Sequence, residues 1–213
     1  MSVWFQVQDH YFKQAKRDGF VARSAYKLEE IDKKFHIFWP EVRTVIDIGC
    51  APGSRLQYVS QHLRHPRSRI IWFDLKKVDI QYPKVTTYQQ DVTEKEKIKS
   101  ILSDELSVRE DLWSNPHDLS WVMVDCIISD MAPDTLWDKS TDALRSINLI
   151  YDTMRMYQEL LKSQGKFVIK VFMWPGFEEF VRYCRDIWWA QHIKVFKPKS
   201  CRSMSKETYV IKI

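Results

Sequence analysis

Four charged residues stand at positions where a charge is unfavourable unless it is paired or takes part in chemistry. They are two lysines and two acids spread over most of the chain, namely Lys27, Asp130, Lys170 and Glu207. Lys170 interrupts the apolar run 167–172, and Asp130 closes the apolar segment that begins at Cys126. Because a charge at a buried strand end must be compensated, we interpret the four as one pre-paired site.

Lys170 is the candidate general base of that site. Burial disfavours the charged form of its amine, and a nearby Lys27 would lower its pKa further, whereas Asp130 and Glu207 would raise it. Taken alone, each of the other three charged residues has a simpler structural interpretation. Lys27 could pair with Glu30 on a helix surface, Asp130 could cap a strand, and Glu207 could be a solvated edge charge.

A second group of residues is suited to hold a nucleoside. A strand predicted over 43–48 runs into a loop in which Gly49 and Gly53 permit a tight turn and Pro52 stiffens it. Asp74 and Asp91 end or follow the next two strands, where carboxylates can accept hydrogen bonds from ribose hydroxyls and from an adenine amino group. No glycine motif that cradles a diphosphate is present. The set therefore favours S-adenosylmethionine over NAD or ATP.

Alternating strands and helices must position these residues. Strands are predicted over 43–48, 69–73, 85–89, 120–129, 167–172, 192–196 and 208–213, helices over 56–63, 94–102, 144–161 and 177–188, and a surface loop over 107–119. Gly165 is expected to cap the third helix. Apolar strands that alternate with helices predict an α/β fold: a Rossmann-like, mostly parallel seven-stranded sheet with helices on both faces. Ligands of such sheets bind at the carboxyl ends of the strands.

Length and composition limit the class of protein. The 213 residues, 45% of them hydrophobic, suit a single domain 1–213, with a basic helical extension over 1–40 and a catalytic core over 41–213. No apolar run approaches the roughly 18 residues of a membrane span, and no secretory signal opens the sequence. The four cysteines and six histidines show no metal-ligand spacing. We therefore expect no metal, no disulfide framework and no membrane partner. We further expect a monomer in a reducing compartment, either the cytoplasm or the mitochondrial matrix.

The net charge of +5 is unevenly distributed. Residues 194–213 contain six basic residues and one acid, and residues 13–34 contain seven basic residues. If folding brings these two segments together, their field would attract a polyanion. A solvated basic surface is the alternative. Trp137 and Trp174, next to the presumed site, are the tryptophans best placed to stack on a base.

The chain resembles the RrmJ/FtsJ family of RNA ribose 2′-O-methyltransferases over about residues 10–213. The resemblance is carried by five ordered blocks, at 19–28, 47–53, 129–133, 168–172 and 197–207. It implies a class I methyltransferase fold, S-adenosylmethionine as methyl donor, and a catalytic tetrad formed by Lys27, Asp130, Lys170 and Glu207. The residues we expect at the donor are Gly49, Pro52, Gly53, Arg55, Asp74, Asp91 and Asp130.

The resemblance further implies that the substrate is a ribose 2′-hydroxyl of structured RNA. The wording Ser129-Asp-Met-Ala-Pro133 favours large-subunit ribosomal RNA, with uridine as the target, over a tRNA anticodon loop. An assembling large ribosomal subunit would then be the partner, and ribosome biogenesis the process.

Two departures affect the donor site and the loop on the substrate side. The family usually has a tryptophan where this chain has Arg55, and an asparagine where it has Asp134, followed by a small, glycine-containing run that 135–139 replaces. Two alternatives therefore stay open. One is the same chemistry on tRNA, and the other is a catalytically idle RNA-binding factor of ribosome assembly.

Overall fold

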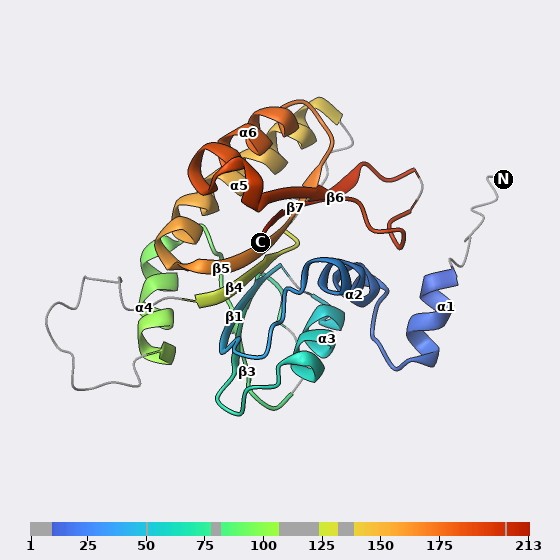
Figure 1. Cartoon of the computed structure of the whole chain (residues 1–213), viewed down its shortest axis with the longest axis vertical. Helices are drawn as coiled ribbons and strands as arrows, with labels where there is room; N and C mark the ends of the chain where they lie inside the picture. The colour runs from blue at the N-terminus through green and yellow to red at the C-terminus, as the bar shows by residue number, and fades with distance from the viewer. Residues whose placement is uncertain (1–9, 50, 78–81, 107–123, 132–138, 203) are drawn as a thin grey trace, which may run out of the picture.

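A computed structural model describes residues 10–49, 51–77, 82–106, 124–131, 139–202 and 204–213 of the chain. These residues form an α/β fold around one seven-stranded sheet (Figure 1). The strands are β1 Thr44–Ile48, β2 Arg69–Asp74, β3 Val85–Gln89, β4 Val124–Ser129, β5 Leu161–Phe172, β6 Ile193–Phe196 and β7 Glu207–Lys212. The helices are α1 His10–Arg17, α2 Ser24–Phe35, α3 Ser54–His62, α4 Lys95–Leu106, α5 Lys139–Leu160 and α6 Phe177–Trp188, with a short 3₁₀ turn, η2, at Ala190–His192.

The strand order is β3-β2-β1-β4-β5-β7-β6, in which only β7 runs antiparallel to its two neighbours. The chain leaves β1 toward β2 and β3, then returns to the other side of β1 as β4, which makes the β1–β4 boundary the topological switch point. In open α/β sheets this boundary is where ligands bind, beyond the carboxyl ends of the strands.

Strand register brings the predicted site residues to one edge. Ile48 of β1 pairs with Ser129 of β4, and Ser129 pairs with Ile169 of β5. The residues that come next along the chain therefore lie at one level, which places Gly49, Asp130 and Lys170 in a row across β1, β4 and β5.

Two hydrophobic cores hold the sheet between its helices. Side chains alternate between the two faces along each strand. Ile46 and Ile48 therefore face the core between the sheet and helices α4, α5 and α6, whereas Val45 faces the core between the sheet and helices α2 and α3. Figure 1 shows these two groups of helices on opposite faces of the sheet. The predicted fold is thus confirmed, with helices on both faces.

Most predicted elements are present, but several bounds differ and one prediction is wrong. The strand expected over 167–172 begins at Leu161. The helix expected over 94–102 continues to Leu106, and the helix expected from 144 begins at Lys139. The prediction that Gly165 caps α5 is wrong, because the helix ends at Leu160 and Gly165 lies inside β5. The register of β5 against β4 shifts there, and a Cβ on Gly165 would meet Leu161 at 2.8 Å. Glycine is thus needed at position 165, where the strand is irregular. The predicted loop 107–119 and the predicted strand residues 120–123 lie outside the described residues.

Within the described part of the chain, no helix combines the length and the apolar character that a membrane crossing requires. The thiols of Cys126, Cys184 and Cys201 are buried and free.

Candidate active site

The four charged residues singled out in the sequence form two ion pairs at the carboxyl edge of the sheet. Lys170, near the end of β5, places its Nζ 2.8 Å from Oδ1 of Asp130, and it also donates to the backbone carbonyl of Asp130 at 2.7 Å. Lys27, on α2, donates to both carboxylate oxygens of Glu207 at 2.5 and 2.7 Å. The expected pre-paired arrangement is therefore what the structure contains.

The pair of Lys27 and Glu207 joins the N-terminal helix to the last strand. Tyr209 donates its hydroxyl to Oε1 of Glu207 at 2.6 Å, from a position two residues along the same strand. Burial acts to raise the pKa of Glu207, but the Lys27 ammonium, the Tyr209 hydroxyl and the Lys170 ammonium outweigh it, so that this pKa lies below its usual value. Glu207 is therefore ionised at neutral pH and holds Lys27 in place.

Glu30 does not pair with Lys27, although it lies one turn further along α2. Its carboxylate instead accepts the backbone amides of Lys199 and Ser200 at 2.7 and 2.8 Å. Arg23 also reaches this segment and donates to the carbonyl of Ser200 at 2.8 Å. These contacts fasten the basic segment that follows β6 to α2, so the two basic parts of the sequence lie side by side.

The Lys170 amine has an unusual protonation equilibrium. Its pKa is lowered to about 7 by burial and by the positive charges of Arg55 and Lys27, against the opposing effect of Glu207. An amine with this pKa is about half neutral at physiological pH, which is the condition a general base requires.

Arg55 lies directly under this edge of the sheet. It belongs to the first turn of α3, and its side chain is buried. Its guanidinium lies 2.7 Å from Oδ2 of Asp130 and 2.9 Å from Oδ1 of Asp47. It also donates to the carbonyl of Gly49 at 3.1 Å. The sequence placed Arg55 among the residues expected at the donor, at a position where the family usually has a tryptophan, and it gave no sign of these ion pairs.

The loop after β1 approaches its neighbours closely. Gly49 has a φ of +68°, and a Cβ there would lie 3.1 Å from the backbone of Met131. Gly53 has a φ of +105° and is the N-cap residue of α3, and Pro52 is exposed. Glycine is required at both positions because other residues rarely adopt this conformation.

The two remaining acids lie at the ends of the next two strands. Asp74 accepts the amide of Ala51 at 2.8 Å through Oδ2 and the amide of Lys76 at 2.8 Å through Oδ1. Asp91 accepts both the amide and the hydroxyl of Thr93 through Oδ1. Both side chains are half-buried, and each carboxylate oxygen can accept more than one hydrogen bond. These carboxylates and the loop after β1 fit a nucleoside ligand whose hydroxyl and amino groups can donate hydrogen bonds to the carboxylates, as in S-adenosylmethionine.

Of the two tryptophans named in the sequence, Trp174 stacks on Phe172 with ring centroids 4.5 Å apart, and Nζ of Lys170 lies 5.6 Å from the Phe172 ring. Trp137 lies outside the described residues, as do Asp134 and 135–138. Tyr209 is the site residue that the sequence analysis missed. Its position two residues after Glu207 on a strand, which places both side chains on one face, could have indicated it.

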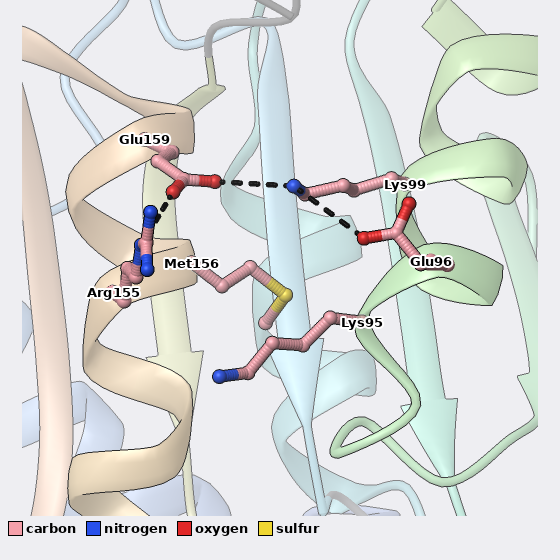
Figure 2. Close-up of a pocket in the computed structure, with 6 residues that line it drawn as sticks. All are labelled: Lys95, Glu96, Lys99, Arg155, Met156 and Glu159. Carbon is pink, nitrogen blue, oxygen red and sulfur yellow. Dashed lines mark hydrogen bonds and ion pairs between the residues drawn. The ribbon is translucent and has the colours of Figure 1, made fainter. Parts of the chain in front are cut away.

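A pocket of about 200 Å³ lies away from these residues, between α4 and α5 (Figure 2). Its lining consists of Lys95, Glu96, Lys99, Arg155, Met156 and Glu159. Glu159 binds Lys99 at 3.5 Å and Arg155 at 3.1 Å, so ion pairs compensate part of the charge in the pocket. None of the residues predicted for catalysis or donor binding lines it.

The seven-stranded sheet, with the glycine loop after β1 and with Asp74 and Asp91 at the ends of the next two strands, defines the class of the protein as a Rossmann-like α/β fold suited to a nucleoside ligand. The FtsJ-like methyltransferase family matches residues 20–213, so the chain belongs to that family. The family and the methyltransferase activity predicted from the sequence are thereby confirmed.

Relatives match over nearly the whole chain. A protein of Oleidesulfovibrio alaskensis named ribosomal RNA large subunit methyltransferase E is 39% identical, over 97% of this chain and 91% of its own length. A protein of the same name from Pelagibacter ubique is 35% identical over 97% of this chain and 91% of its own. In fold, the chain is similar to a crystal structure described as a putative ribosomal RNA methyltransferase from Plasmodium falciparum, with a TM-score of 0.74 and 23% identity, over 91% of this chain and 97% of that one.

Proposed function

We propose that this chain transfers a methyl group from S-adenosylmethionine to a ribose 2′-hydroxyl of large-subunit ribosomal RNA, with uridine as the target. The observation that carries the proposal is the pairing of Lys170 with Asp130 beside the pairing of Lys27 with Glu207, at the carboxyl edge of the sheet. The names of the relatives, which are ribosomal RNA large subunit methyltransferases, support the choice of RNA.

Lys170 is the base in this proposal. A ribose 2′-hydroxyl is scarcely ionised at neutral pH, so a positioned acceptor for its proton assists attack. The neutral amine of Lys170 takes that proton and becomes an ammonium. Bound S-adenosylmethionine supplies a methyl group on a sulfonium, whose carbon–sulfur bond breaks as the carbon–oxygen bond forms and leaves a neutral thioether.

The neighbours of Lys170 position the reacting groups. Asp130 orients the Lys170 amine through its carboxylate, and Lys27, held by Glu207, is placed to bind the target hydroxyl or a flanking phosphate. On the donor side, Asp74 would hold ribose hydroxyls and Asp91 the adenine amino group, while the turn at Gly49 and Gly53 lets the backbone approach the ligand. Much of the rate would then come from alignment of methyl carbon and oxygen.

The basic surface would bind the RNA backbone. The segment 197–202 is fastened to α2 by Glu30 and Arg23, so lysines and arginines from both ends of the chain form one surface beside the tetrad. Such phosphate contacts make RNA binding weaken steeply as salt is raised. The described residues contain no separate RNA-binding domain, which fits a substrate that is already folded.

Calorimetric titration of S-adenosylmethionine into the purified protein tests the donor site. We expect micromolar binding that Asp91→Ala abolishes and that Glu96→Ala, an exposed acid of α4, leaves unchanged. Absence of binding by the folded wild-type chain would favour an idle RNA-binding factor of ribosome assembly. Modification found in tRNA and not in large-subunit RNA would favour the anticodon-loop alternative.

A further inference from the structure

Arg55 lies beneath the site and not on its surface. Its side chain is 4% exposed, compared with 19% for Asp130 and 10% for Lys170. The guanidinium is fixed from two strands, since it pairs with Asp47 of β1 at 2.9 Å and with Asp130 beyond β4 at 2.7 Å. The carbonyl of Gly49 accepts a third contact at 3.1 Å. A group held in this way has little freedom to reach a ligand, but it can hold its partners.

The Asp130 carboxylate is shared between two cations. Its Oδ1 faces Lys170 at 2.8 Å, and its Oδ2 faces Arg55 at 2.7 Å. A carboxylate gripped on both oxygens cannot rotate about its χ2 torsion without losing one of these pairs. Without Arg55, it could turn both oxygens toward the lysine.

We propose that Arg55 is a positioning residue of the transfer reaction, which fixes the Asp130 carboxylate so that this carboxylate orients the Lys170 amine. The inference rests on the proposed function, because it assigns Arg55 to the same site. It differs from a donor-binding role, which the sequence suggested for Arg55 and which would require the guanidinium to touch S-adenosylmethionine.

The charges around Lys170 give the arrangement a measurable consequence. The groups that face its amine are Asp130 beyond β4, Arg55 on α3, Lys27 on α2 and Glu207 on β7. After burial, the positive charge of Arg55 is the strongest influence that lowers the pKa of Lys170. Loss of Arg55 would remove this cation and release Asp130 toward the amine, and both changes raise that pKa.

The test measures Lys170 directly in the unliganded protein. Lysine labelled with ¹³C and ¹⁵N in its side chain gives an NMR titration, and the Lys170 resonance is assigned by its loss in Lys170→Arg. Arg55→Met removes the charge but keeps an unbranched side chain, and Arg55→Lys restores a cation without the planar fork. Because Asp47 is fully buried, the combination of Asp47→Asn with Arg55→Met provides a folded variant if the single one fails to fold.

We expect the midpoint of the Lys170 NMR titration to rise by about one pH unit or more in Arg55→Met and by less in Arg55→Lys. Below pH 7, kcat should fall about tenfold for each unit of that rise and recover above pH 9. The dissociation constant of S-adenosylmethionine should change less than about threefold. Lys162→Met, which breaks the ion pair with Asp125 at the other end of β4, is the matched control and should shift neither midpoint nor rate profile.

An unmoved Lys170 midpoint in folded Arg55→Met would overturn the inference. A tenfold loss of donor affinity with that midpoint unmoved would assign Arg55 to the donor pocket instead. A wild-type protein that neither binds S-adenosylmethionine nor methylates RNA would refute the proposed function. The Lys170 titration needs no ligand, so it tests the coupling between Arg55 and Lys170 separately from that outcome.

Discussion

Replacement of Lys170 by methionine should make the folded chain more stable at neutral pH while it removes activity. The amine has an ordinary pKa of 10.5 and a pKa of about 7 in the folded protein. Between these two values the unfolded chain binds more protons than the folded one, so the stability of the wild type rises with pH across this window. Removal of the amine removes that dependence.

The size of the effect follows from the two pKa values. Proton linkage makes the buried amine destabilising by about 4 kcal/mol at pH 7 and by about 1 kcal/mol at pH 9.5. From pH 7 to pH 9.5 the wild type should therefore gain about 3 kcal/mol relative to Lys170→Met, in which Asp130 keeps its ion pair with Arg55. Other titrating groups are common to both proteins and cancel in the difference.

Urea denaturation of both proteins at the two pH values measures this difference. Lys97→Met, which removes an exposed lysine of α4, controls for the loss of a surface charge. If the free-energy difference between wild type and Lys170→Met is the same at both pH values, the amine stays charged in the folded state. Lys170 would then not be a poised base.

Three further substitutions test other parts of the site. Tyr209→Phe removes the hydrogen bond to Glu207 and should lower the unfolding free energy by about 1 kcal/mol, read by thermal denaturation; an unchanged melting temperature would contradict the contact. Glu30→Ala should detach the segment 197–202 from α2 and weaken RNA binding several-fold in a filter assay at fixed salt, without effect on donor affinity. Gly49→Ala forces a positive φ on alanine and should cost about 1–3 kcal/mol of stability, and full donor affinity in that variant would show that the close approach of the loop is not needed.

Much of the fold was predictable because local patterns and tertiary packing agree. The strand over 85–89 and the helix over 177–188 have the predicted bounds, since apolar spacing and flanking turn residues mark both. Gly165 was misread because a glycine after a helical pattern usually ends the helix, whereas here the helix had already ended and β5 begins irregularly. A register shift depends on the neighbouring strand, which local sequence does not describe.

The charged residues of the candidate site could be predicted from the sequence, but the interaction partners of several of them could not. Charges at buried strand ends identify Asp130 and Lys170 from sequence, because few alternatives account for them. The partner of Glu30 depends on how the segment after β6 packs against α2, and the partners of Arg55 depend on the adjacency of β1 and β4. Both are long-range features, so the sequence pointed to a nearby partner for Glu30 and to none for Arg55.

Methyl transfer to large ribosomal subunits tests the central claim most directly. Subunits from cells that lack this protein would be incubated with the purified chain and radiolabelled S-adenosylmethionine, with tRNA in parallel, and the product mapped by its resistance to alkaline cleavage at the 2′-O-methylated ribose. We predict label at a ribose of large-subunit RNA, a loss of more than about 100-fold in Lys170→Ala, and no loss in Lys97→Ala. Label confined to tRNA, or full activity in Lys170→Ala, would contradict the account.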